Sequence, residues 1–213
     1  MNKKKFQKSL LSLKSWRERA FILALAERAL PNARLYFDSI EHQPLSQNDF
    51  PYGLPELMDK IWQHLLVLKK DVEKDSTQGE EQIVSLLDQV VACIPDAQQS
   101  DHYGVLPAVD CLSLMEQALL AGLNDDKKRA YEASQFSLET VMQFIEFSEG
   151  GSLSEEQLIK LFDTHPLIAR EFSFQSELND LLRTASHPGD AFLNELRTLA
   201  QDDGVSNIGV SLV

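Results

Sequence analysis

The chain has 213 residues, of which 43% are hydrophobic and 25% are charged. This composition is ordinary for a soluble globular protein and excludes a disordered tail, a collagen and a membrane bundle. Twenty Lys and Arg residues against 33 Asp and Glu residues give a net charge of −13. Most of such a surface repels a phosphate backbone, so we expect no nucleic-acid partner.

The charge is distributed unevenly along the chain. Residues 1–34 carry nine basic and two acidic side chains, a balance of +7, whereas residues 35–213 carry eleven basic and 31 acidic side chains, a balance of −20. The basic start either grips an anionic partner or packs beside the acidic body and relieves its self-repulsion. We favour the second interpretation.

The compartment follows from two observations. No apolar stretch approaches the length that spans a bilayer, so we expect no membrane partner. Cys93 and Cys111 both lie in strongly apolar helical patterns, which is typical of buried, reduced thiols. We therefore predict a cytoplasmic protein.

Helical periodicity dominates the N-terminal part of the chain. Apolar residues recur at helical spacing from Phe6 to Leu13. Ser15 and Glu18 then have the spacing of a capping box, which predicts a helix that begins at residue 16. Pro31 fits the first turn of a helix, so we expect the chain to break there and to start a further short helix.

The middle of the chain predicts two helices around a polar connection. Pro55 opens a helix with one broad apolar face, after a loop that contains Pro44 and Pro51. We interpret Asp71–Gly79 as a solvated acidic loop. The helical pattern resumes over residues 80–94 and is stopped by proline.

Residues 105–123 form the most apolar segment. Its few polar positions, Asp110, Ser113 and Gln117, lie on one stripe with Glu116 beside it. A helix that is apolar around most of its circumference is buried, so we expect this helix to be central.

The C-terminal half predicts four more helices and a tail. The expected helix starts are marked by cap residues or prolines, namely Asp125, Ser154, Pro166 and Gly189 or Asp190. Residues 208–213 are the one β-like run, and one run cannot form a sheet. We expect this tail to dock in an extended form or to pair with a partner chain.

The predicted fold is a single all-α domain over residues 1–213, with about eight or nine helices around the helix at 105–123. Strand signals and solenoid periods are missing. The segment at 71–79 is the best candidate for a domain boundary, but apolar helices on both sides of it argue for one shared core.

The motifs of common enzyme and metal sites are absent. The nine glycines form no phosphate-binding loop, and neither GxSxG nor HExxH occurs. The five histidines form no Glu-x-x-His pairs and no zinc spacing. We therefore predict no catalytic residue, no metal and no cofactor, and we lean away from an enzyme.

Four residues stand out as candidates for a pocket or an interaction. Asp110 is a carboxylate inside an apolar helix, which costs energy unless it is paired or hydrogen-bonded. Tyr103 and Asn207 are its candidate companions, and Arg28 follows an apolar run directly. For Asp110 and Arg28 the simpler interpretation is an internal hydrogen bond or ion pair.

Several segments together resemble the YjaG-like family of bacterial proteins of unknown function. The most specific are Tyr103-Gly-Val-Leu-Pro-Ala-Val-Asp110 and Ser206-Asn-Ile-Gly209, and the resemblance covers essentially the full length. It implies an all-helical fold and a link to signalling, but no catalytic residue. The basic N-terminus and the loop at 43–54 depart from the family pattern.

These observations leave two main hypotheses, besides attachment to a nucleic acid or a membrane through the basic N-terminal arm. The first is an acidic helical protein that binds another protein in a regulatory role, linked to signalling, with a homodimer as one arrangement. The second is a small-molecule-binding protein or enzyme with a pocket between helices near Asp110, Tyr103 and Arg28.

Overall fold

The computed structural model describes residues 3–40, 53–70, 76–124 and 126–211. These residues form nine α-helices and no β-strand, together with two short 3-10 turns. The helices are α1 (Lys3–Leu10), α2 (Trp16–Ile40), α3 (Leu54–Lys70), α4 (Ser76–Cys93), α5 (Val105–Leu123), α6 (Arg129–Glu149), α7 (Glu155–Thr164), α8 (Pro166–Thr184) and α9 (Asp190–Gln201). The predicted all-α fold is confirmed.

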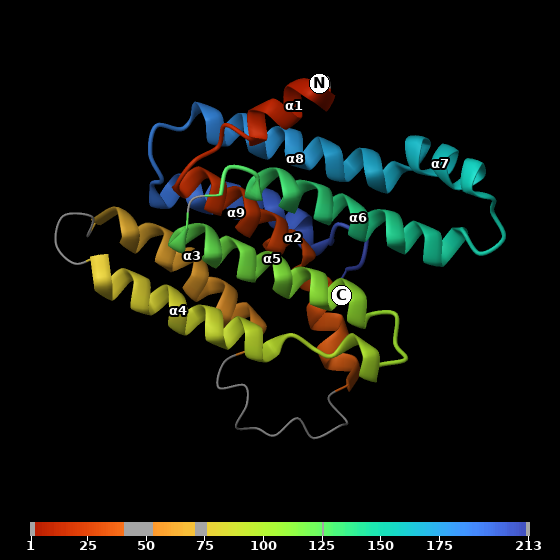
Figure 1. Cartoon of the computed structure of the whole chain (residues 1–213), viewed down its shortest axis with the longest axis horizontal. Coiled ribbons are helices and arrows are strands. Elements are labelled where there is room, and N and C mark those ends of the chain that lie inside the picture. The colour runs from red at the N-terminus through yellow and green to blue at the C-terminus, as the bar shows by residue number, and fades with distance from the viewer. Residues whose placement is uncertain (1–2, 41–52, 71–75, 125, 212–213) are drawn as a thin grey trace.

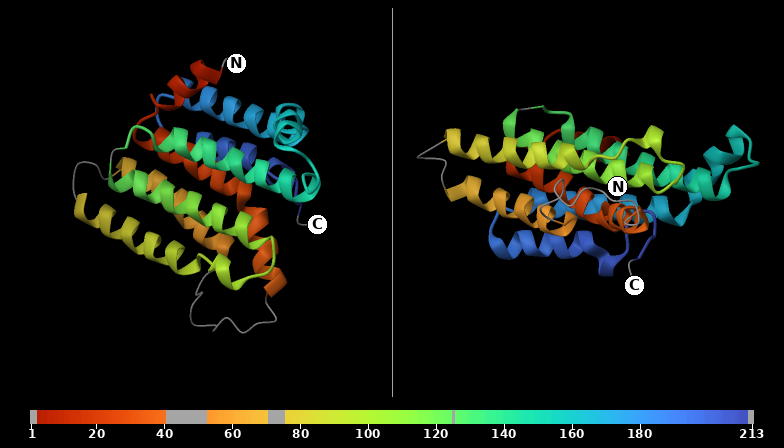
Figure 2. Two further views of the ribbon diagram at one scale, coloured as in Figure 1. Left: turned by 45° about the vertical axis from the view of Figure 1, so that its right-hand side comes forward. Right: turned by 90° about the horizontal axis from the view of Figure 1, so that it is seen from below.

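The helices pack in layers (Figures 1 and 2). Helices α4, α5 and α6 lie side by side in one layer. Helices α3, α2 and α8 lie behind them, and α9 covers the far side of α2 and α8. The short helices α1 and α7 pack against α6 and α8. One hydrophobic cluster contains buried residues from all of these helices except α7.

Two helices share the centre of the molecule. Helix α5 lies in the core as predicted, with Cys111, Leu112 and Met115 fully buried. Helix α2 is buried more completely, because every residue from Glu18 to Leu30 is buried. Its charged residues hid this role from the sequence, since an apolar circumference is the usual sign of a central helix.

The prediction that no apolar stretch approaches the length of a membrane span was wrong, because α5 is the one described helix that has this length and composition. More than half of that segment is buried inside the protein. This is the pattern of a core helix, which passes the same test of length and apolarity.

The start of α2 is as predicted, but its cap and its end are not. Ser15 has a φ of 54°, which is left-handed backbone and not the extended conformation of an ordinary N-cap. The predicted break at Pro31 was wrong, because α2 runs through Pro31 to Ile40. Proline removes the donor to the carbonyl of Glu27. Burial of the residues on either side of Pro31, from Ala29 to Ala33, offsets this loss.

Two further boundaries show how well local signals worked. The predicted cap of α7 is confirmed as a capping box, in which Ser154 accepts a hydrogen bond from the backbone of Gln157 and the Gln157 side chain bonds back. The acidic loop was predicted too long, because α4 begins at Ser76 and includes Gly79. The remainder of that loop, the loop over 41–52 and the predicted cap at Asp125 lie outside the described residues.

The C-terminal segment folds back on the body of its own chain. A single antiparallel bridge joins Val205 to Ser211, and Gly209 takes a φ of 84° in the turn between them, a conformation that suits glycine. Ile208 is 5% exposed and packs with Val141 and Ile145 of α6. The tail therefore docks within the molecule through Ser211.

Candidate functional site

Arg28 is an internal cation on α2. It is 3% exposed, and its Nε donates to Glu171 Oε2 of α8 at 2.9 Å. The other oxygen of Glu171 accepts hydrogen bonds from Ser137 and Gln175 at 2.8 Å each. The guanidinium also lies 4.4 Å from the ring centroid of Phe174. Arg28 thus has the internal partners that the simpler sequence interpretation expected.

A second contact of Arg28 ties the C-terminal turn to the core. Its Nη1 donates to Asp202 Oδ2 at 3.1 Å, and Arg170 donates to the same carboxylate. Burial pushes the pKa of Asp202 upward, but the hydrogen bond from Arg170 and the charges of Arg28 and Arg170 outweigh it, so this pKa lies below its ordinary value. This cluster locks the end of α9 onto α2 and α8.

Asn207 belongs to the same side of the molecule. It is 1% exposed, and its Oδ1 accepts a hydrogen bond from Asn32 Nδ2 at 2.9 Å. Asn32 lies one turn after Arg28 on α2, so both face the C-terminal segment. Arg28 and Asn207 therefore form one buried polar region that holds this segment in place.

Tyr103 lies elsewhere, at the end of the molecule where α5 begins and α6 ends. Its ring stacks on Phe147 with 3.9 Å between centroids and 14° between planes, and Phe144 lies 6.2 Å away. Phe147 is 63% exposed, and Leu106, one turn after Tyr103, is 41% exposed. We call these four residues, Tyr103, Leu106, Phe144 and Phe147, the aromatic patch.

Asp110 lies on α5, about two turns after Tyr103, and meets α6 at Thr140. Its Oδ2 accepts a hydrogen bond from Thr140 Oγ1 at 2.7 Å. Burial raises the pKa of Asp110 to about 6, against the effect of the Thr140 hydrogen bond and with help from the charge of Glu139. Burial, and next the Asp110 charge, raise the pKa of Tyr103 to about 12. Asp110 is therefore a half-buried acid that is costly to ionise.

The four predicted residues thus fall into two separate pairs. Arg28 and Asn207 share the buried polar region, while Tyr103 and Asp110 share the edge of the aromatic patch. The structure does not assemble them into one pocket between helices. Sequence reasoning missed Phe144 and Phe147, although their i, i+3 spacing near the end of a helix was a visible signal.

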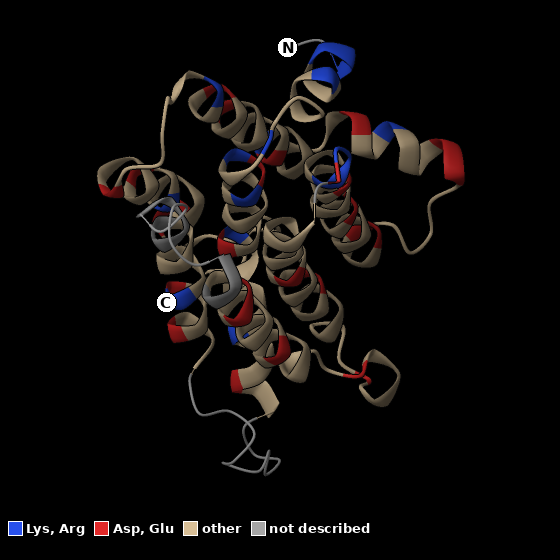
Figure 3. Ribbon diagram, turned by 60° about the vertical axis from the view of Figure 1, so that its left-hand side comes forward, with Lys and Arg blue, Asp and Glu red and all other residues tan. Residues whose placement is uncertain are grey.

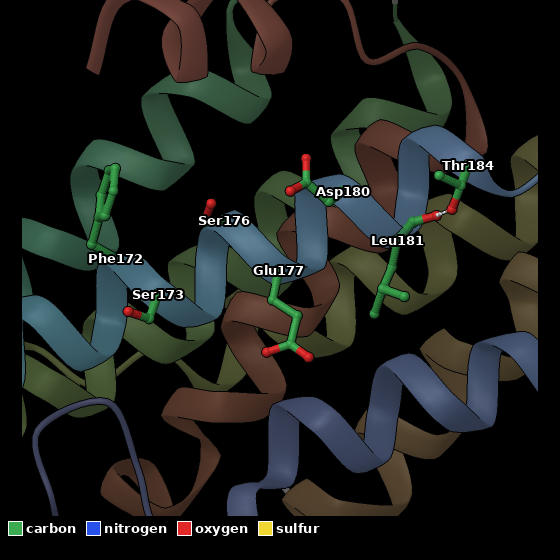
Figure 4. Close-up of a pocket in the computed structure, with 7 residues that line it drawn as sticks. All are labelled: Phe172, Ser173, Ser176, Glu177, Asp180, Leu181 and Thr184. Atoms are coloured by element: carbon green, nitrogen blue, oxygen red, sulfur yellow. Dashed lines mark hydrogen bonds between the residues drawn. The ribbon is translucent and has the colours of Figure 1, made fainter. Parts of the chain in front are cut away.

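A groove on α8 contains none of these four residues. It has a volume of about 590 Å³, and Figure 4 shows Glu177 and Asp180 pointing to opposite sides of the helix. The lining residues are Phe172, Ser173, Ser176, Glu177, Asp180, Leu181 and Thr184. None of these is a histidine, lysine or cysteine, so its serines have no strong base beside them to form a nucleophile.

Metal-ligand clusters are missing from the part of the chain that the structure describes, where no three His, Cys, Asp or Glu side chains come together. His64 is instead 4% exposed and lies 3.2 Å from Arg19 Nη2. Burial and then the Arg19 charge lower the pKa of His64. Sequence reasoning missed this buried pair.

Charge is segregated on the surface that carries the aromatic patch. Residues 76–123, which contain α4 and α5, have seven acidic side chains and no Lys or Arg. Residues 130–159 have six acidic side chains and again no Lys or Arg. The lysines gather on α1 near the N-terminus instead (Figure 3). The layer of α4, α5 and α6 is therefore an acidic face.

Comparison with known proteins places the chain among uncharacterised bacterial proteins. Residues 5–211 match the family described as "Protein of unknown function (DUF416)". An uncharacterised protein of Haemophilus influenzae is 30% identical over 206 residues, which is 95% of each chain. The uncharacterised protein YjaG of Escherichia coli is 28% identical over 93% of this chain and 92% of its own.

A solved structure supports the fold alone. The crystal structure of a DUF416 family protein from Shewanella baltica is similar to this one with a TM-score of 0.77. The two sequences are 24% identical, and the likeness covers 97% of this chain and 98% of that one.

Proposed function

This chain belongs to the DUF416 family of proteins of unknown function, and from that premise we propose that it acts by binding a partner protein with a basic surface at the aromatic patch. The single observation that carries the proposal is Phe147, which is 63% exposed while stacked on Tyr103. We place this binding in the cytoplasm, because the two buried cysteines are free, which fits a reducing compartment. The role that we propose for it is regulatory and linked to signalling.

The aromatic patch has the chemistry of a binding hot spot. Aromatic residues are enriched at the centres of protein interfaces, where a partner excludes water from them. The stacked rings of Tyr103 and Phe147 are already ordered, so less conformational entropy is lost when a partner covers them. Leu106 extends the apolar surface along α5.

The charge around the aromatic patch supports a basic partner. Glu139 and Glu146 of α6 and Asp101 before α5 lie near these residues in sequence, with no Lys or Arg between residues 130 and 159 to balance them. A basic surface is attracted to such a face and is steered toward it. A second copy that presented the same face would be repelled.

A small-molecule site at Asp110 is the second candidate. The observation that favours it is the carboxyl group of Asp110, whose pKa is raised to about 6 by burial, because shifted carboxyl groups are common in functional sites. Ligand-induced thermal stabilisation that disappears in the Asp110→Asn variant would support this candidate over the first.

The proposal is tested by affinity capture from a bacterial lysate with three forms of the chain. Proteins held by the wild type at low salt are compared with those held by Phe147→Ser and by Ile159→Ser. Ile159 is a matched control, because it is also a large apolar residue, 54% exposed, but lies on α7.

We expect at least one basic protein to bind the wild type and the control and to be lost with Phe147→Ser. The purified pair should then protect residues 101–106 and 144–147 from hydrogen exchange. Equal capture by all three forms, or protection elsewhere, would contradict the proposal.

A further inference from the structure

Helix α4 carries apolar side chains on two faces. Its inner residues Ile83 and Val90 are at most 1% exposed and pack in the core. Val84 and Val91, one position later in each case, are 44% and 48% exposed. An edge helix that needed only one apolar face would carry polar residues at these positions.

The exposed valines adjoin two partly buried apolar residues, and together the four form an apolar row along one side of α4. Leu87 of α4 and Ile94, the residue directly after the end of α4, are partly buried at the edge of the core, and each follows an exposed valine by three residues. The positions 84, 87, 91 and 94 repeat with the alternating spacing of three and four residues by which one helix packs along another. We call these four residues the α4 seam.

The α4 seam has no covering element among the described residues. Helix α4 is the outermost helix of its layer and packs against α5 and α3 (Figure 1). From Val84 to the end of α4 at Cys93 the seam runs along ten residues, which is about 15 Å of helix. This length matches two to three turns of a second helix lying alongside.

Carboxylates border the α4 seam. Glu80, Glu81 and Asp88 are exposed on α4. On a helical wheel, Glu80 lies among the seam residues, whereas Glu81 and Asp88 lie beside Val84 on the side away from the core. No Lys or Arg occurs between residues 76 and 123. An occupant therefore needs apolar residues for the seam and positive charges for its border.

We propose that the α4 seam is the docking site for a basic amphipathic helix of a partner protein. Leucine-type residues of that helix pack on Val84, Leu87, Val91 and Ile94, and its Lys or Arg residues pair with Glu81 and Asp88. This surface is distinct from the aromatic patch, and the inference holds or fails independently of the function proposed above.

Charge distinguishes this occupant from the alternatives. If α4 of a second copy lay against the seam, it would bring its own bordering carboxylates and no Lys or Arg to pair with Glu81 and Asp88, and like charges along such a contact are destabilising. An anionic lipid surface is repelled by the same carboxylates. Of these three occupants, a basic amphipathic helix alone offers apolar residues to the seam and positive charges to the carboxylates beside it.

The test uses a fluorescein-labelled synthetic peptide of three heptads. Each heptad has Leu at the a and d positions, which face the seam, and Lys at the positions beside them. Its anisotropy is measured against the full-length chain, the double variant Val84→Asn/Val91→Asn and the control Ile159→Asn. A scrambled peptide of the same composition separates amphipathic docking from simple charge attraction, and circular dichroism checks that each variant is folded.

We expect the double variant and the scrambled peptide each to bind at least tenfold more weakly, and the control to bind within twofold of the wild type. The variant Glu81→Gln/Asp88→Asn, which keeps the apolar seam, should weaken binding and reduce its salt dependence. Tight binding that survives Val84→Asn/Val91→Asn, or equal binding of the scrambled peptide, would overturn the inference.

Two further measurements separate the alternatives. Loss of peptide binding in Phe147→Ser but not in the seam variant would place the peptide on the aromatic patch, which overturns the inference and leaves the proposed function standing. A dimer in analytical ultracentrifugation that the seam variant dissociates would assign the seam to a second copy and overturn it equally. A monomeric chain in which the seam alone controls peptide binding supports it.

Discussion

Arg28 and Asp110 differ in how their charges are compensated by neighbouring side chains. Both residues are charged groups within largely apolar helices. Arg28 is 3% exposed, and its charge meets Glu171, which is 0% exposed and accepts two further hydrogen bonds. Asp110 has a hydrogen bond from Thr140 but no basic partner among the residues that the structure describes, and Glu139 adds a like charge.

The comparison indicates where function is to be sought. A buried charge that is paired with an opposite charge and hydrogen-bonded is expensive to disturb. A carboxyl group beside exposed aromatic rings that lacks a cationic partner lowers the stability of the folded protein when it is ionised. Such a group can still exchange its proton or pair with a ligand. We therefore propose that the Arg28 side of the molecule serves stability and that the Tyr103 side serves binding.

The largest effect that the comparison predicts is that of Arg28→Met. This change leaves Glu171 as a buried charge without its cation, which costs about 3–5 kcal/mol of unfolding free energy. Urea denaturation at pH 7 measures it, with Arg183→Met as the control, because Arg183 is exposed on α8. A loss below about 1 kcal/mol would mean that Arg28 does not hold the core together.

Asn207→Ala tests the smaller contact on the same side. It removes the acceptor of Asn32 Nδ2, whose side chain is 4% exposed, and a buried donor without a partner costs about 1–3 kcal/mol. The unfolding free energy should fall by that amount, while Asn194→Ala, an exposed position on α9, should change it little. Equal stability of the two variants would show that the C-terminal turn does not depend on this hydrogen bond.

Much of the fold was predictable from the sequence because helix signals are local. The capping box at Ser154 and the proline at Pro166 marked the starts of α7 and α8 correctly. The continuation of α2 through Pro31 was not predictable from neighbours in sequence. It depends on helices packed around α2 from distant parts of the chain, and this burial outweighs the local preference of proline.

Asp110→Asn should stabilise the protein at neutral pH. The unfolded chain releases this proton near pH 4 and the folded chain near pH 6. The folded state therefore binds the proton more tightly, and the carboxyl group costs stability progressively as the pH rises from about 4 to 6. Asparagine keeps the acceptor for Thr140 without the charge.

We expect a gain of about 1–2 kcal/mol at pH 7, after allowance for partial exposure to solvent, and none at pH 3.5, where Asp110 is protonated in both states. Thermal unfolding at the two pH values measures this difference, with Asp88→Asn as the exposed control on α4. A destabilised variant at pH 7 would show that the carboxylate charge is compensated in the folded protein, as that of Glu171 is.

The candidate site was only half predictable for a related reason. Sequence singled out Asp110 and Arg28 correctly as polar groups in apolar segments, but it grouped residues that the fold separates. Tyr103 meets Phe147, which is 44 positions away along the chain, and Arg28 meets Glu171, which is 143 positions away. Pairings over such distances are decided by how helices pack, and a single sequence carries little information on this.

The smallest predicted effect on stability is that of Phe147→Ser. Because Phe147 is 63% exposed, its loss should change the unfolding free energy by no more than about 0.5 kcal/mol, which is usual for surface positions. Chemical denaturation measures this, with Ile145→Ser as the contrast, because Ile145 is fully buried on the same helix. An exposed aromatic residue that contributes little to folding is free to serve binding. If Phe147→Ser instead cost as much as Ile145→Ser, the stacked rings would belong to the core, and the division of the molecule into a stabilising and a binding side would fail.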